Sequence, residues 1–515
     1  MSKYNKPTRG KDKTVNHEGD VAYKLDSKTE LYSTVCTSML QNKFYEKEDE
    51  TLNRIRTLIK TTDPEFVAKL AVYAREKMYL RSIPLVLAVE LAKVHNEDSI
   101  LGRTVSRIVQ RADEITEILA YYKEANKDNW ETEKNSGKTK HLGRLSKQIA
   151  KGLNFSFNKF DEYQFAKYNR KGQVTLKDAL FLVHPKAKNK EQQKLFDKIV
   201  NGELKTPETW EVKMSEGGKE GADKKEVWEK MISSGKMGYM AMLRNLRNFL
   251  EADVSQKHMA DVAQTLADPE KVRKSKQLPF RFLSAYKELK GNKSSKATMI
   301  LNALEEGVIT SIENLKGYDY NTTVCVACDV SGSMQHSISD RSKVELYDIG
   351  LLLGMLLQSR CKSVITGIFG DTWKIKALPQ KSVLQNVMDL HNIEGEVGYS
   401  TNGYKVIQDL ITRKEKVDKI MIFTDCQMWN SYSGSRGSFA TCWSEYKKIH
   451  PEAKLYLFDL SGYGNTPVSV KGDGVYLIAG WSEKVFDMLA AIDKGSNAVK
   501  EIESIDLFKK PSKKK

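Results

Sequence analysis

The chain has 515 residues, of which 40% are hydrophobic and 29% are charged, as in folded globular proteins and unlike disordered chains. At roughly 100–200 residues per domain, this length predicts two to four domains. Lysine and arginine number 83 against 67 aspartates and glutamates, and the net charge of +16 favours a polyanionic partner. The polar first residues lack the apolar core of a secretory signal, and no uninterrupted apolar run reaches about 18 residues. We therefore expect neither secretion nor a membrane span.

Up to about residue 320, where most of the positive excess lies, the chain has the pattern of helices with short connectors. Apolar residues recur at helical spacing in nine segments: 65–79, 83–94, 100–122, 142–153, 176–183, 190–200, 225–233, 240–250 and 259–267. No crisp repeat period is visible, so we expect degenerate, HEAT-like helical pairs rather than strict repeats. The polar, glycine-containing segments 124–140 and 215–225 are predicted loops.

After residue 320, strands and helices alternate. Apolar strands are predicted at 323–328, 364–369, 420–424, 455–458 and 475–478, and helices at 344–357, 383–390, 405–411 and 483–492. Near-continuous apolar strands separated by helices indicate a parallel, doubly wound sheet covered on both faces. The predicted domains are a polar N-terminal tail (1–20), a helical-repeat domain (21–318), an α/β domain (319–500) and a C-terminal segment with a basic tail (501–515).

Six cysteines are few for this length, and most lie in apolar runs. This pattern predicts buried, reduced thiols and a cytoplasmic location rather than a disulfide framework. Cys325 and Cys328 fall within one predicted strand, where their side chains would point to opposite faces. Core packing is therefore the favoured interpretation, and a metal or redox pair is the alternative.

The most specific motif is Asp329-Val-Ser331-Gly-Ser333, directly after the first predicted strand of the α/β domain. In doubly wound sheets, ligands bind beyond the carboxyl ends of the strands. Asp425 follows another predicted strand, and Thr401 precedes a helix. Two carboxylates and three hydroxyls are hard oxygen ligands that suit Mg²⁺ or Mn²⁺. The alternative is that Asp329-x-Ser-x-Ser only caps the following helix.

The five residues Asp329, Ser331, Ser333, Thr401 and Asp425 resemble the metal-ion-dependent adhesion site (MIDAS) of von Willebrand factor A domains, D-x-S-x-S…T…D. The resemblance covers roughly residues 320–500. It implies a Rossmann-like domain with a bound divalent cation that keeps one position open, often for a partner's carboxylate.

Segment 138–200 is the most basic part of the chain, with 15 lysines and arginines against 5 aspartates and glutamates. Aromatic residues are interleaved with these cations: Phe155, Phe157, Phe160, Tyr163, Phe165 and Tyr168. Cations that contact phosphates, together with rings that stack on bases, are features of single-stranded nucleic-acid binding. For most of these rings, packing in the core of a helical domain is the favoured alternative.

Several stretches resemble the TROVE module of the Ro autoantigen family, including its bacterial members. They are Tyr163-Gln-x-x-Lys167-Tyr168, Lys177-Asp178, Leu182-x-His184-Pro-Lys186, Pro207-x-Thr-Trp-Glu211, Met242-Leu-Arg-Asn-Leu246 and Leu278-Pro-Phe-Arg-Phe282. The resemblance extends over roughly residues 20–500, because Ro proteins also end in a von Willebrand factor A domain. It implies an α plus α/β fold in which a HEAT-like ring is closed by that domain within a monomer.

The resemblance also implies a ribonucleoprotein that binds Y-like small noncoding RNA and single-stranded 3′ ends of misfolded RNA, for stabilisation or RNA quality control. Lys167, Lys171 and His184 match RNA-contacting positions of the family. Lys171 stands where the family commonly has arginine, so a bidentate contact there is in doubt. Arg144 and Lys147 lie just upstream at helical spacing and are predicted to extend the same face.

We therefore predict a non-enzymatic RNA-binding protein, with an RNA-processing nuclease as a conceivable partner. No histidine stands at a matching strand end to act as a base, and neither a nucleotide-binding P-loop nor a hydrolase nucleophile motif occurs. The alternative is a protein-interaction scaffold that holds an acidic partner through the metal site, with RNA binding incidental.

Overall fold

The computed structural model describes residues 12–38, 40, 43, 45–126, 145–169, 171–207, 209–219, 223–310, 321–339, 342–429, 438–472 and 474–509. The chain divides into two compact units, neither continuous in sequence. Unit 1 comprises Met1–Leu52 and Glu216–Val499, and unit 2 comprises Asn53–Ser215 and Lys500–Lys515. The predicted domain boundaries, including the one at 318/319, stay predictions.

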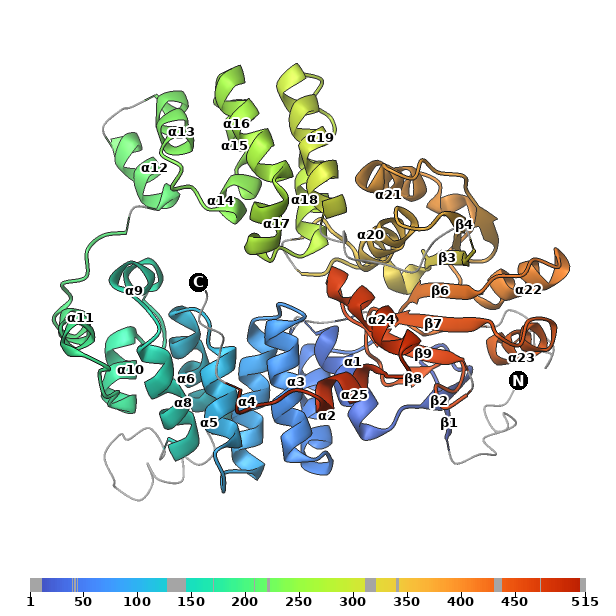
Figure 1. Cartoon of the computed structure of the whole chain (residues 1–515), viewed down its shortest axis with the longest axis horizontal. Coiled ribbons are helices and arrows are strands. Elements are labelled where there is room, and N and C mark those ends of the chain that lie inside the picture. The colour runs from blue at the N-terminus through green and yellow to red at the C-terminus, as the bar shows by residue number, and fades with distance from the viewer. Residues whose placement is uncertain are drawn as a thin grey trace. The chain divides into compact units, whose positions relative to one another are not determined.

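Unit 2 is built from antiparallel helices that lie side by side (Figure 1). Its helices are α3 (Pro64–Glu76), α4 (Ser82–Val94), α5 (Ile100–Ile108), α6 (Asp113–Ala125), α8 (Lys147–Phe157), α9 (Glu162–Tyr168), α10 (Leu176–Val183) and α11 (Lys190–Asn201), together with most of α2 (Glu48–Thr61). Gly152 of α8 meets α5, where an added Cβ would lie 2.6 Å from the Cβ of Val105. This close approach explains why glycine stands inside a helix despite its low helix propensity.

A buried ion pair joins the helices at the centre of unit 2. The Arg75 guanidinium of α3 donates to the Glu114 carboxylate of α6 at 2.7 Å, and the two side chains are 8% and 0% exposed. Glu114 also accepts the backbone N–H groups of Gln110 and Arg111, at 2.7 and 3.0 Å. One carboxylate therefore ties α3 to the turn that separates α5 from α6.

The helical part of unit 1 runs from α13 (Lys224–Ser233) through α14 (Tyr239–Arg244), α15 (Leu246–Glu251), α16 (Gln256–Ala267), α17 (Pro269–Ser275) and α18 (Pro279–Leu289) to α19 (Ser295–Thr310). In the sequence, α12 (Trp210–Lys219) spans the boundary at which unit 2 ends and unit 1 resumes. Glu305 of α19 accepts three backbone N–H groups at the start of α21 (Val383–His391), at 2.7–2.9 Å. A carboxylate at a helix N-terminus satisfies otherwise unpaired donors, so this contact joins the helical part to the sheet part.

The sheet of unit 1 has six strands in the order β5-β4-β3-β6-β7-β9. The strands are β3 (Thr323–Asp329), β4 (Ser363–Phe369), β5 (Trp373–Ile375), β6 (Lys419–Thr424), β7 (Lys454–Asp459) and β9 (Val475–Ala479). Only the pairing of β5 with β4 is antiparallel within this sheet. The predicted parallel strands are confirmed, and the edge strand β5 makes the sheet mixed.

Helices cover both faces of this sheet. On one face, α20 (Leu346–Gln358) packs on β3 and β6, and an added Cβ on Gly354 would lie 2.6 Å from Cys328 Sγ. On the other face, Cys325 belongs to a core formed with α22 (Tyr404–Thr412) and α23 (Phe439–Ile449). The two thiols thus point in opposite directions, and all six cysteines are free and buried. The prediction that they pack as small hydrophobic residues is confirmed.

Residues 13–36 also belong to unit 1. The hairpin of β1 (Lys13–Val15) and β2 (Val21–Lys24) pairs with β8 (Asn465–Thr466), and α1 (Ser27–Cys36) lies against β9. The Tyr32 hydroxyl accepts from the backbone N–H of Ala479 at 2.8 Å, and Ser33 Oγ donates to the buried Asp459 carboxylate. Residues 12–20 are therefore part of the fold, although their polarity had predicted a tail.

Other differences from the sequence predictions are local. The predicted helix 100–122 is broken at 109–112, and 240–250 is two helices that meet at Asn245. Residues 215–219 lie in α12 rather than in a loop, whereas most of the predicted loop 124–140 lies outside the described residues. Apolar periodicity marks the helical stripe but not the turn residue that interrupts it, which explains these errors.

We predict that Glu114→Ala lowers the free energy of unfolding by about 3–5 kcal/mol, because it leaves the Arg75 guanidinium buried without its counterion. Urea unfolding followed by far-UV circular dichroism measures this loss. Glu65→Ala is the matched control, since Glu65 is 54% exposed and pairs only with Lys69 on the same helix surface. A loss at Glu114 no larger than at Glu65 would contradict the assignment.

Candidate functional site

The first candidate site lies at the carboxyl ends of β3 and β6, which are adjacent parallel strands. It contains the five predicted residues Asp329, Ser331, Ser333, Thr401 and Asp425, all of them buried, and we call it the strand-end site. Asp329 ends β3, and the two serines lie in the turn and short 3-10 helix after it (η1, Gly332–Met334). Asp425 follows β6 directly.

Hydrogen bonds hold Asp329 in place. Its Oδ1 accepts the Ser331 backbone N–H at 2.9 Å, and its Oδ2 accepts the Thr424 hydroxyl at 2.6 Å. The Ser331 and Ser333 hydroxyl oxygens are 3.4 Å apart. Asp425 Oδ1 accepts the Gln427 backbone N–H at 2.9 Å, whereas Asp425 Oδ2 is buried without a hydrogen-bond partner.

Burial raises the pKa of both carboxyl groups because it penalises their charged forms. Burial raises the pKa of Asp329 to about 6, although the hydrogen bonds from Ser331 and Thr424 act in the opposite direction. Burial, followed by the charge of Asp329, raises the pKa of Asp425 to about 8. Two buried carboxylates, an unpartnered carboxylate oxygen and adjacent hydroxyls form a donor set that a hard divalent cation fits.

Backbone hydrogen bonds bring the Thr401 segment to the same place. The Gly332 N–H donates to the Tyr399 carbonyl at 2.9 Å, and the Trp429 N–H donates to the Thr401 carbonyl at 3.1 Å. These bonds fix residues 399–401 between the turn after β3 and the loop after β6. The structure therefore gathers the segments of all five predicted residues at one end of the sheet.

Residues near the N-terminus contact the loop after β6, and no feature of the sequence predicted this contact. The His17 backbone N–H donates to Gln427 Oε1 at 3.0 Å, and Asn16 Nδ2 donates to the Met428 carbonyl at 2.6 Å. The Tyr45 hydroxyl donates to Glu18, and its pKa is raised by burial, by Glu18 and by the charge of Asp425. Tyr45 thus lies close to the strand-end site.

Among the residues that the structure describes, no three or more His, Cys, Asp or Glu side chains form a cluster able to hold a metal ion. Any cation at the strand-end site would thus depend on hydroxyl ligands in addition to its two carboxylates. The described helices include none that is long and apolar enough to cross a membrane.

The second candidate site is a surface of unit 2 formed by exposed aromatic and basic side chains. Lys167 Nζ lies 5.8 Å from the ring centre of Tyr163 and 5.6 Å from that of Tyr168, both on α9. The Arg111 guanidinium covers the Tyr168 ring at 4.4 Å. Cation–π contacts of this kind hold a lysine beside a ring without neutralising its charge.

Five of the six interleaved aromatic residues divide into a buried and an exposed group, and Tyr168 is intermediate. Phe157, Phe160 and Phe165 are buried and pack on one another, with ring centres 5.8–6.0 Å apart. Phe155 and Tyr163 are 50% and 47% exposed. The core-packing alternative is therefore correct for the first group and wrong for the second.

Phe181, on α10, is 55% exposed and was not identified from the sequence. The sequence did contain a signal for this exposure. The buried stripe of α10 consists of Leu176, Ala179, Leu180 and Val183, and Phe181 does not lie on that stripe. Arg111, whose guanidinium covers Tyr168, was also missed, because it precedes that tyrosine by 57 positions in the sequence.

Of the predicted RNA contacts, Lys167, Lys171 and His184 are all exposed. Lys167 and Lys171 lie in and just after α9, and His184 ends α10 in a left-handed conformation with φ 47°. We use the name basic–aromatic surface for these three residues together with Phe155, Tyr163 and Phe181. The α9 and α10 segments both contact α8. Phe165 of α9 stacks on Phe157 of α8. After α10, the Lys186 backbone N–H donates to Asn154 Oδ1, and its carbonyl accepts from Asn158 Nδ2.

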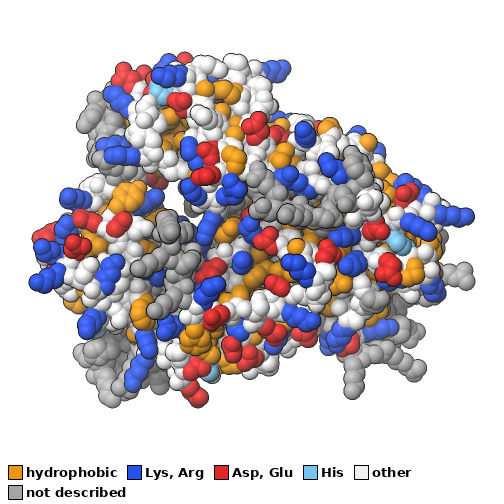
Figure 2. Space-filling model, in the orientation of Figure 1, with side chains coloured by type: hydrophobic (Ala, Val, Ile, Leu, Met, Phe, Trp, Pro, Cys, Tyr) orange, Lys and Arg blue, Asp and Glu red, His pale blue; other side chains and the backbone are white. Residues whose placement is uncertain are grey.

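Lys147 is exposed at the first turn of α8. Lys186 bonds Asn154, which lies two turns further along α8, about 10 Å from Lys147 along the helix axis at 1.5 Å per residue. Lys147 therefore lies at the opposite end of α8 from the His184 segment. Arg144 falls outside the described residues. On the face visible in Figure 2, lysine and arginine side chains are interspersed with acidic ones, so the net charge does not form one continuous cationic field there.

Paired helices, a mixed α/β sheet and exposed cations beside aromatic rings define a class of protein suited to a polyanionic ligand. Residues 24–202 and 201–346 match the TROVE domain family. Because these matches cover more than half of the chain, the chain belongs to the TROVE-domain family, which is the family of the Ro proteins, and those proteins bind RNA.

Two curated relatives and one solved structure are similar to this chain. Telomerase protein component 1 of mouse and that of rat are each 24% identical over an alignment of 346 residues, and each match covers 51% of this chain and 13% of the relative. The chain thus spans about an eighth of the length of these relatives. The crystal structure of the Deinococcus radiodurans Ro (Rsr) protein has a TM-score of 0.58 at 15% identity, covering 90% of this chain and 99% of that one. This likeness supports the fold.

Proposed function

We propose that this TROVE-domain protein binds RNA without modifying it, and that single-stranded RNA contacts the basic–aromatic surface. The observation that carries the proposal is the exposure of Phe155, Tyr163 and Phe181 among lysines of α8–α10. Exposed rings among cations are suited to single-stranded nucleic acid, because bases stack on such rings while lysines contact the phosphates.

The resemblance to Ro proteins supports the finer parts of this proposal. The RNAs would be small noncoding RNA and single-stranded 3′ ends, held in the cytoplasm for stabilisation or quality control. A ring closed by a von Willebrand factor A domain within a monomer also belongs to the proposal. The sheet order and the arrangement of the strand-end site agree with a domain of that kind.

We also propose that the strand-end site holds Mg²⁺ or Mn²⁺ through Asp329, Ser331, Ser333, Thr401 and Asp425. Support comes from the unpartnered Asp425 Oδ2 and from the raised pKa of both carboxyl groups, because a raised pKa shows that burial disfavours their charged forms when no counterion is present. A cation there would neutralise both carboxylates and fix the three loops that carry its ligands. These residues would hold the ion and perform no reaction on RNA.

A single-stranded RNA that neutralises about five lysines should show a slope of roughly −3.5 for log affinity against log salt, at about −0.7 per phosphate. Replacing Lys167 and Lys171 with alanine should flatten the slope by about one unit. Filter binding across a salt series measures it. The control, Lys60→Ala with Lys77→Ala, removes the same charge from exposed positions of α2 and the end of α3. Equal slopes for the two double variants would place the RNA elsewhere.

Tyr163→Ala should weaken binding of single-stranded RNA by about 1–3 kcal/mol if a base stacks on the exposed ring. Tyr163→Phe keeps the ring and removes only the hydroxyl, so its affinity should stay close to that of the wild type. Fluorescence anisotropy of a labelled oligonucleotide separates the two variants. If both lose affinity equally, the hydroxyl and not the ring makes the contact, and the stacking interpretation fails.

Asp329→Ala should abolish Mn²⁺ binding in calorimetry, because the ion loses one of its two anionic ligands. Affinity for single-stranded RNA, measured in a gel shift, should stay unchanged, because the strand-end site and the basic–aromatic surface belong to different units. Asp487→Ala, at an exposed position after the sheet, is a charge-matched control. Loss of RNA affinity in a folded Asp329→Ala protein would show that the two sites are not independent.

A further inference from the structure

A cavity of about 720 Å³ lies within unit 1 between α14, α15, α18 and the segment before α20. Two motifs that carry the TROVE resemblance meet in it, since Leu243, Arg244 and Leu246 come from the first and Phe280 and Arg281 from the second. Nothing in the proposed function uses these residues.

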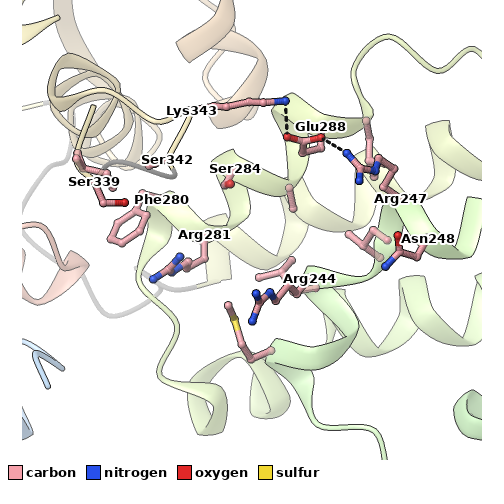
Figure 3. Close-up of a pocket in the computed structure, with 16 residues that line it drawn as sticks. Arg244, Arg247, Asn248, Phe280, Arg281, Ser284, Glu288, Ser339, Ser342 and Lys343 are labelled. Carbon is pink, nitrogen blue, oxygen red and sulfur yellow. Dashed lines mark hydrogen bonds and ion pairs between the residues drawn. The ribbon is translucent and has the colours of Figure 1, made fainter. Parts of the chain in front are cut away.

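The basic side chains of this cavity differ in whether their charge is neutralised. Glu288 accepts from Arg247 at 3.4 Å and from Lys343 at 2.9 Å, and Arg247 also pairs with Glu251 at 3.3 Å. The hydrogen bond from Lys343 is the main reason that the pKa of Glu288 is lowered. These two cations are therefore compensated within the pocket wall (Figure 3).

Arg244 and Arg281 are different. In the part of the chain that the structure describes, neither forms an ion pair with a carboxylate, and both face solvent. Figure 3 shows them reaching from α14 and α18 into the same space, away from Glu288. The surrounding protein, and then the charge of Arg244, lower the pKa of Arg281, as expected for two guanidinium groups near each other in a concave site.

We propose that this cavity, the arginine pocket, binds a nucleoside monophosphate unit whose phosphate lies between Arg244 and Arg281. Two forked, uncompensated guanidinium groups are suited to the several oxygens of one phosphate. The cavity has the size of a small-molecule site and exceeds what a phosphate alone would fill. Ser284 and Asn248 in the lining offer polar contacts to sugar or base, and Met240 and Ala285 offer apolar ones.

The same chemical unit can come from a free nucleotide or from one residue of an RNA strand. The proposal concerns a place in the fold that is separate from the basic–aromatic surface, so it stands whether or not RNA binds there. The probes are AMP, UMP, inorganic phosphate, a single-stranded octauridylate and poly-glutamate, each titrated calorimetrically into the full-length protein.

Arg244→Gln and Arg281→Gln should each weaken nucleotide binding at least about tenfold, since each removes a charge-assisted contact to phosphate. Arg247→Gln is the matched control, because it removes the same charge from the same cavity at a position already paired with Glu251 and Glu288. It should change affinity less than about threefold. Arg281→Lys keeps the charge but not the planar fork, so we expect an intermediate affinity. Thermal unfolding checks that every variant is folded.

Binding of AMP or UMP that depends on both arginines supports the proposal with a free nucleotide as ligand. If only octauridylate shows binding that depends on both arginines, the proposal is supported with one residue of an RNA strand as the ligand. The proposal is overturned if the Arg244→Gln protein binds every nucleotide probe as tightly as the Arg247→Gln protein. It is also overturned if poly-glutamate or inorganic phosphate binds as tightly as the nucleotides, because the pocket would then be a general anion surface.

Discussion

The pairing of β2 with β8 joins residues more than 400 positions apart, and the arrangement of unit 1 depends on it. Tyr23 and Lys24 lie opposite Thr466 and Asn465, and α1 follows at once, where Ser33 bonds the buried Asp459 carboxylate. Residues 53–215 lie between two segments of unit 1 in the sequence, so the sheet part of unit 1 combines chain segments from either side of them. Non-local pairing of this kind carries a large loop-closure cost, which the buried contacts of α1 offset.

The same hairpin brings an internal carboxylate close to the strand-end site. The turn between β1 and β2 carries His17 and Glu18, which contact Gln427 and Tyr45. The position of His17 and Glu18 matters for the scaffold alternative, in which an acidic partner binds a metal ion at the strand-end site. That partner would compete with Tyr45, whose ring stacks on His17 with centres 5.0 Å apart. The contacts near the N-terminus thus weigh against an external acidic partner at the strand-end site.

Sequence reasoning succeeded where the signal is local. The strands β3, β4, β6, β7 and β9 were predicted nearly to the residue, because buried parallel strands are continuous apolar runs bounded by polar turns. The strand-end residues were predicted for the same reason, since their positions follow from where the strands end. The sequence could not predict β1, β2 and β8, which are elements of only two to four residues, and the pairing of β2 with β8 joins segments remote in the chain.

The basic–aromatic surface and the arginine pocket show a second limit of sequence reasoning, which concerns charge compensation. Composition alone does not distinguish the four cations of the arginine pocket, Arg244, Arg247, Arg281 and Lys343. In the structure, Glu288 of α18 forms ion pairs with Arg247 and Lys343. In α9, Lys167 keeps its charge because its neighbours are rings. A cation's availability to a phosphate therefore depends on the side chains that the fold places beside it. The net charge of +16 indicates the sign of a partner, whereas the cations available to contact it are those left without a carboxylate.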